Sequence, residues 1–96
     1  MGLKEAYLEK HEAQLRAWDA EIQKLEAKAA AANAEVKIVY YEQLQGLYSK
    51  RDGAREELHA LKNAGADAWE NLKTGVEHAW DDLKTGMKRA VERFKS

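Results

Sequence analysis

Residues 68–78 read AWENLKTGVEH, and residues 79–89 repeat this segment as AWDDLKTGMKR. A partial third copy, AVERFKS, occupies residues 90–96. Eleven residues make about three turns of α-helix, so equivalent side chains return to nearly the same helix face. The repeat therefore predicts a helix over about residues 68–95 that is built for packing. Its apolar face consists of Trp69, Leu72, Val76, Trp80, Leu83, Met87, Val91 and Phe94.

A second apolar stripe runs through the N-terminal part of the chain, from Leu8 to Val39. Its members are separated by alternating gaps of three and four residues, which is the spacing of a coiled coil. The alanine-rich segment at residues 29–34 favours helix, and the chain contains no proline. We therefore expect one continuous helix over about residues 3–63. The alternative is a break near Asn33, which would give a three-helix bundle.

Near residue 40 the stripe shifts by one position and continues to residue 61. Its later members are Tyr40, Leu44, Leu47, Leu58 and Leu61. At the shift, apolar residues cover most of the helix circumference, which predicts that several helices converge there. These residues are Val36, Ile38, Val39, Tyr40 and Tyr41. Gly46 and Gly53 are each unfavourable in a helix by about 1 kcal/mol relative to alanine, and they either permit close backbone approach or are simply tolerated.

The boundary between the two predicted helices lies at residues 63–67. Gly65 suits the left-handed conformation that often ends a helix. Asp67, followed three residues later by Glu70, is typical of a helix start. We therefore expect an antiparallel helical hairpin, with Trp69 and Trp80 among the positions most sensitive to replacement by alanine.

The lengths of the two predicted helices indicate self-association. At 1.5 Å per residue the first helix would be about 90 Å long and the second about 42 Å. The returning helix would then leave the first part of the stripe bare, and an apolar stripe of that length needs a partner. We expect a homo-oligomer, most simply a dimer, although another protein could also bind. The predicted oligomer seam consists of Leu8, His11, Leu15, Trp18, Ile22, Leu25, Val36, Val39 and Tyr40.

Composition narrows the possible functions. The 96 residues suffice for a single domain, and the balance of 16 basic against 17 acidic residues argues against nucleic acid as a main partner. The absence of cysteine excludes disulfides and thiolate metal sites. No apolar run approaches the roughly 20 residues of a membrane span, and the N-terminal residues lack the apolar core of a secretion signal. These features predict a cytoplasmic protein.

No group of residues predicts catalysis. The three histidines lack metal-ligand spacing, the hydroxyl residues form no recognisable nucleophile–base pair, and the carboxylates follow helical surface spacing. We therefore expect a non-enzymatic protein with no catalytic, cofactor or metal site. The alternative function is binding to a membrane surface through residues 68–96. This segment carries six basic and five acidic residues, so anionic lipid would attract it only weakly.

The chain resembles a known family, through Tyr41-Glu42-x-Leu44, Lys50-Arg51-x-x-Ala54 and, most specifically, the segment that begins at Gly65. The pattern Gly65-x-Asp67-Ala68-Trp69, followed by the doubled tryptophan repeat, is similar to small bacterial coiled-coil proteins linked to stress responses. The resemblance covers nearly the whole chain and is strongest from residue 41 onward. It implies an all-α fold and a role in a stress response, and it implies no ligand or reaction.

Overall fold

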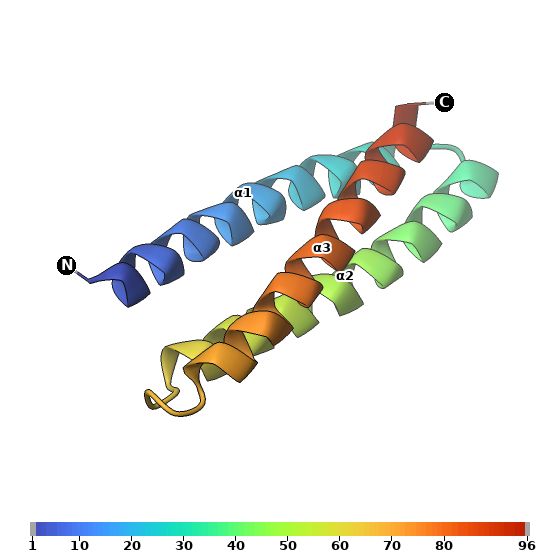
Figure 1. The fold of residues 1–96 in the computed structure, drawn as a ribbon. Coiled ribbons are helices and arrows are strands. Elements are labelled where there is room, and N and C mark those ends of the chain that lie inside the picture. The colour runs from blue at the N-terminus through green and yellow to red at the C-terminus, as the bar shows by residue number, and fades with distance from the viewer. Residues whose placement is uncertain (1, 96) are drawn as a thin grey trace.

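The structure, a computed structural model, describes residues 2–95, which form three antiparallel α-helices (Figure 1). Helix α1 spans Leu3–Ala31, α2 spans Ala34–Lys62 and α3 spans Trp69–Lys95. They make an elongated bundle of 51 × 21 × 17 Å, and residues 2–95 contain no strand. The predicted all-α class is confirmed, and the three-helix alternative describes the arrangement of the helices.

The expected continuous helix over residues 3–63 is wrong, because the chain breaks at Ala32 and Asn33. Both residues are extended, with ψ of 161° and 168°. The Asn33 side chain caps α2 by accepting a hydrogen bond from the Val36 amide at 3.0 Å. Asparagine is among the best N-cap residues, and such a cap is worth about 1 kcal/mol. The cap and the packing of α1 along its own chain therefore override the helix propensity of the neighbouring alanines.

A single core runs the length of the bundle. Each helix buries one stripe, and α2 makes extensive contacts with both of the other helices. The side chains of Ile22, Leu44, Leu61, Leu83 and Phe94 are at most 1 % exposed. At one end of the core, the rings of Tyr40 and Phe94 stack with their centroids 4.0 Å apart.

Polar side chains join α1 to α2 along the edge of the core. The Arg55 guanidinium lies 2.9 Å from the Asp19 carboxylate, and Arg51 approaches the same carboxylate at 3.8 Å. The Tyr48 hydroxyl donates a hydrogen bond of 2.5 Å to Glu26. These pairs set how far α1 and α2 are shifted along each other.

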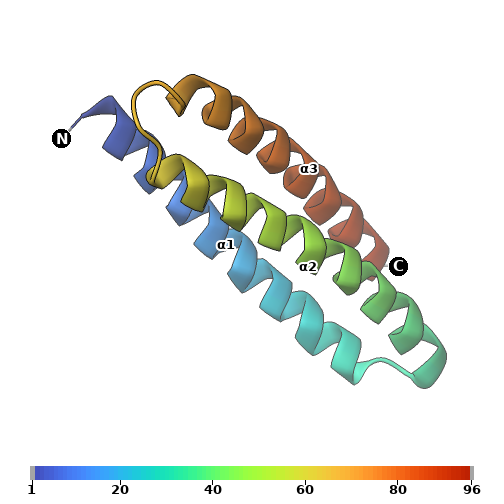
Figure 2. The same ribbon diagram turned by 90° about the horizontal axis from the view of Figure 1, so that it is seen from below.

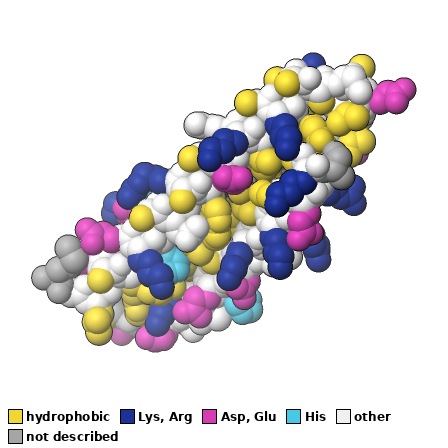
Figure 3. Space-filling model, turned by 90° about the horizontal axis from the view of Figure 1, so that it is seen from above, with side chains coloured by type: hydrophobic (Ala, Val, Ile, Leu, Met, Phe, Trp, Pro, Cys, Tyr) yellow, Lys and Arg dark blue, Asp and Glu magenta, His cyan; other side chains and the backbone are white. Residues whose placement is uncertain are grey.

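Aromatic rings line the contact between α1 and α3, where the two helices touch less extensively. Tyr7 stacks on His11 at 4.2 Å and meets the edge of Trp69 at 5.8 Å. Trp80 lies 4.8 Å from the His11 ring and 5.8 Å from Trp18. Figure 3 shows one face of the bundle on which apolar side chains form a band between charged ones. The eleven-residue tryptophan repeat thus places both rings against α1.

The connection between α2 and α3 occupies residues 63–68, close to the expected position. The predicted left-handed conformation of Gly65 is wrong, because no glycine among residues 2–95 has a positive φ. Asn63 caps α2, and its backbone amide donates a hydrogen bond to the His59 carbonyl at 3.2 Å. Two backbone hydrogen bonds then turn the chain, from the Ala64 amide to the Leu61 carbonyl and from the Ala68 amide to the Gly65 carbonyl. Because the reversal is spread over these two turns, it does not require a residue in the left-handed conformation.

Candidate interaction surface

Most of the predicted oligomer seam is covered by its own chain. Leu8, Leu15, Ile22 and Leu25 are buried against the other helices, and Tyr40 is buried too. His11 and Trp18 are half-buried. The expectation that this seam lacks a partner within the chain is therefore wrong. The seam is covered because the chain breaks at residue 33, which lets α1 fold back along α2 and α3.

The residues predicted to pack the hairpin belong to the common core of the bundle, although Trp69 and Trp80 contact α1. The buried members are Leu44, Leu47, Leu58, Leu61, Val76, Leu83, Met87 and Phe94. The half-buried members are Trp69, Leu72, Trp80 and Val91. The predicted turn residues, Gly65 and Asp67, are exposed in the connection that follows α2.

The first turns of α2, residues 34–41, expose an unusual amount of apolar surface, and we call this segment the α2 overhang. Ile38 is 63 % exposed, Val39 43 %, Tyr41 41 % and Val36 37 %. Among residues 2–95 the remaining large hydrophobic side chain with this much exposure is Leu3, at the far end of α1. Exposed apolar residues are ordinary when scattered, but four so close together mark a candidate contact surface.

The overhang is exposed because α2 begins beyond the end of α1, as Figure 2 shows. The extended residues Ala32 and Asn33 carry the chain past the last turn of α1 before α2 starts. Helix α3 covers the inner side of the overhang, where Tyr40 meets Phe94. The outer sides of the overhang are therefore partly open to solvent, and their apolar side chains are 37–63 % exposed.

Shallow hollows flank the overhang on two sides. One, of about 510 Å³, is lined by Ala34, Lys37, Ile38, Tyr41, Glu42 and Gln45. The other, of about 380 Å³, is lined by Glu35, Val36, Val39, Tyr40 and Arg93. Both are open, so they fit the side chains of a docked helix better than an enclosed small molecule.

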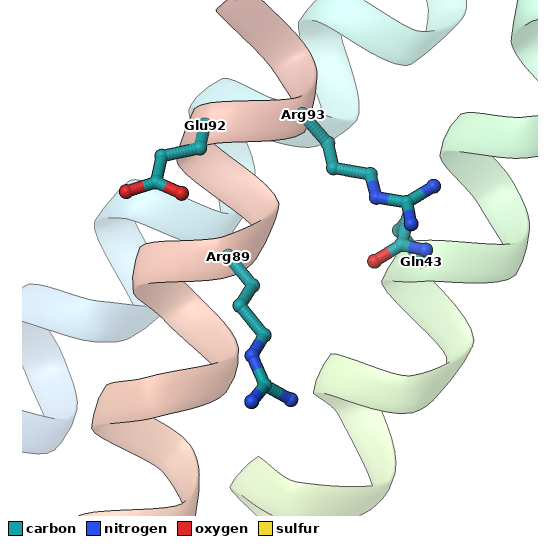
Figure 4. A pocket seen from close by; sticks show the side chains of 4 residues that line it. All are labelled: Gln43, Arg89, Glu92 and Arg93. Atoms are coloured by element: carbon teal, nitrogen blue, oxygen red, sulfur yellow. The ribbon is translucent and has the colours of Figure 1, made fainter.

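Another hollow, of about 660 Å³, lies between α2 and α3 (Figure 4). Arg93 extends from α3 toward Gln43 on α2, Arg89 points along the gap between the two helices, and Glu92 points to the opposite side. All four side chains lie at the open surface of the bundle. This arrangement is that of a solvated face, and it lacks the buried polar groups that hold a substrate.

Titratable groups with shifted pKa values lie along α1 and α2 and are structural. Burial, the hydrogen bond to Glu26 and the negative charge of Glu26 raise the pKa of Tyr48 to about 12. Burial and the nearby Glu77 carboxylate raise the pKa of Tyr7. A raised pKa keeps a phenol protonated at neutral pH and makes it a poorer nucleophile, so neither tyrosine points to catalysis.

Metal-ligand clusters and membrane-spanning helices are both absent from residues 2–95. No three histidine, aspartate or glutamate side chains in this range lie together in a way that could hold a metal ion. No helix within it has the length and apolar character needed to cross a membrane.

The sequence pattern singled out the overhang residues but predicted the wrong environment for them. The all-round apolar pattern of residues 36–41 predicted that several helices converge there. In the described chain α3 covers one side of this segment through Phe94, and α1 ends before the start of α2. The informative signal was Asn33, a strong cap residue placed just before the apolar run.

The chain matches no protein-family model, no curated protein and no solved structure. The resemblance to bacterial stress-linked coiled-coil proteins therefore stays a prediction.

Proposed function

We propose that this protein is a non-catalytic structural element that works by self-association through the α2 overhang. The observation that carries this proposal is the exposure of Val36, Ile38, Val39 and Tyr41 within a single helix segment. Fully burying an exposed apolar side chain contributes about 1.5–3 kcal/mol. These four side chains are 37–63 % exposed, so covering each one gains a part of that free energy.

A structural role is supported by how the rest of the chain is used. The apolar stripes of all three helices face the core, and the aromatic rings pack between α1 and α3. The hollows are open and lie at the surface. The same packing weighs against the membrane alternative, because α3 turns Val76, Leu83 and Phe94 inward. Lipid binding through that face would require α3 to leave the bundle.

The native mass across a concentration series tests the proposal. We expect light scattering after gel filtration to give a dimer whose fraction rises with concentration. Val39→Glu places a charge on the overhang and should shift the protein to the monomer. Lys88→Glu lowers the net charge by two units, against one for Val39→Glu, but on an exposed part of α3, and it should leave the mass unchanged. A monomer at every concentration, or equal effects of the two variants, would contradict the proposal.

Anionic vesicles supply the test of the alternative. If the protein pellets with vesicles and its tryptophan emission shifts to the blue only when lipid is present, membrane binding replaces self-association as the better account. Tryptophan emission that is already blue-shifted without lipid, and no sedimentation with vesicles, are the results expected of the folded bundle.

A further inference from the structure

The break at Ala32 and Asn33 has the features of a hinge that can open. If α1 and α2 were joined into one straight helix, their buried apolar stripes would lie on the same side of that helix. If residues 32 and 33 became helical, the stripe would continue in phase from Ile22, Leu25 and Ala29 through Ala32 to Val36 and Val39. Helix propensity on the N-terminal side is high, since residues 29–32 are all alanine. Among the described contacts at the hinge, the cap bond from Val36 to Asn33 holds the bend.

The register between α1 and α2 gives the geometry of an opened form. Three of the four pairs that join the two helices share one register: Glu26 with Tyr48, Asp19 with Arg55, and Glu12 with Lys62. Each of these three is centred in sequence on Lys37, and the longer contact of Asp19 with Arg51 is centred on residue 35. Side chains lean toward the N-terminus of their own helix, so the matching backbone midpoint is a little earlier, at about residue 35 or 36. The midpoint of the register thus falls inside α2, and the bend lies before it.

Two straightened copies can reproduce every one of these pairs between chains. In the opened form, α1 and α2 of each copy make one continuous helix, and the two long helices run antiparallel. The α1 segment of the second copy then packs against α2 and α3 of the first copy. The two-fold axis then passes near Val36, and Val39 of each copy lies close to Ala32 of the other. A large residue against a small one is a favourable way to bring two helices together. The side of the overhang that carries Val36 and Val39, exposed in the closed chain, becomes the centre of the contact.

We propose that two copies of this protein exchange α1, and that the occupant of the α2 overhang is the same segment of the second copy. This inference rests on the proposed self-association and specifies its mechanism. The contacts of α1 with α2 and α3 are the same in both forms, so they do not decide the equilibrium. The cap at Asn33 favours the closed monomer, whereas burial of Val36 and Val39 and the helicity of residues 32–33 favour the exchanged dimer. Exchange of identical elements is an established low-cost route to a dimer.

Two hinge variants act on this equilibrium in opposite directions. Asn33→Ala removes the cap from each monomer and improves the helix propensity of the open form. We expect the dimerisation constant to rise roughly 25-fold, about fivefold for each of the two caps lost. Ala34→Pro places proline at the first residue of α2, where it is well tolerated, and Asn33 already has the extended conformation that precedes proline. Proline would interrupt a continuous helix, so this variant should be monomeric at all concentrations.

Cross-linking separates exchange from simple docking. Asp19→Cys and Arg55→Cys are combined in one chain, which has no cysteine of its own, and the isolated dimer is treated with a short bismaleimide. Exchange brings residue 19 of one copy to residue 55 of the other, so a covalent dimer should appear on a denaturing gel. The monomer fraction, treated identically, should give internal links and remain one chain in size.

The outcomes are distinct for the two proposals. A dimer that gives only internal links, or whose abundance ignores both hinge variants, overturns the exchange while self-association through the overhang stands. A wild-type protein and an Asn33→Ala variant that both remain monomeric overturn both. Circular dichroism of Ala34→Pro checks that its monomeric mass belongs to a folded helical chain.

Discussion

Replacing Leu83 with alanine tests the core of the bundle directly. Leu83 lies in the middle of α3 and is 0 % exposed. Removing a fully buried leucine costs the transfer free energy of the lost methyl and methylene groups and leaves a cavity, together about 3 kcal/mol. A domain of this length has a free energy of unfolding of roughly 5–14 kcal/mol, so the change is a large part of the total.

Urea unfolding followed by circular dichroism measures this effect. At a slope of about 2 kcal/mol per molar, the midpoint should fall by roughly 1.5 M. The melting temperature should fall by roughly 12–24 °C. Because association would stabilise the folded state, both proteins are compared at the same low concentration.

Two control variants sharpen the test. Leu3 is 92 % exposed, so Leu3→Ala should change the free energy of unfolding by less than about 0.5 kcal/mol. Trp69 is half-buried beside Tyr7, and the space left by Trp69→Ala would open to solvent, so we expect a smaller loss than at Leu83. The sequence alone ranked Trp69 among the most sensitive positions. If Trp69→Ala or Leu3→Ala destabilises the protein as much as Leu83→Ala, the described core is wrong.

Three further predictions concern α2 and its contacts with α1. Gly46 and Gly53 have no atom within 4 Å of an added Cβ, so changing either to alanine should raise the free energy of unfolding by about 0.5–1 kcal/mol, and a loss in urea unfolding would show that something packs on these positions. In an ultraviolet titration the phenol of Tyr48 should ionise with a pKa of about 12, and this late step should vanish in Tyr48→Phe. Because the pKa of Tyr48 in the folded chain lies above the unfolded value near 10, its contribution to stability is complete below pH 10 and is lost as the pH rises toward 12; equal pH profiles for the wild type and Tyr48→Phe would refute this. Asp19→Asn weakens the partly exposed pairs with Arg51 and Arg55 and should cost less than about 1 kcal/mol, falling further in high salt; a cost that ignores salt would point to packing instead.

The helical class and the packing faces were accessible from the sequence, because the spacing of apolar residues reports which side of a helix is buried. Leu44, Val76 and Leu83 were placed on the inner faces by spacing alone, and all are 0 % exposed. The position of the second connection followed from a cluster of residues that end or start helices. Such signals are local, and each residue contributes to them independently of the rest of the fold.

The break at Asn33 was harder to predict because two nearly balanced free energies compete there. The alanines on the N-terminal side favour continuation, while the asparagine cap and the covering of Leu15 and Ile22 by the same chain favour a bend. The covering is a tertiary effect that no window of sequence contains. The candidate surface was missed for the same reason, since the exposure of Ile38 depends on where α1 ends.

The distance between the chain ends has a mechanical consequence. Lys4, near the N-terminus, bonds through its ammonium group to the Ala64 carbonyl at 3.0 Å, at the end of the bundle where α2 joins α3. The C-terminal turn of α3 lies at the opposite end, near the start of α2 (Figure 1). A pulling force applied to the two termini would therefore act parallel to the helix axes across the 51 Å length of the bundle. Helices loaded in this direction must slide past one another, so many side chains resist the force together before any one helix can peel away.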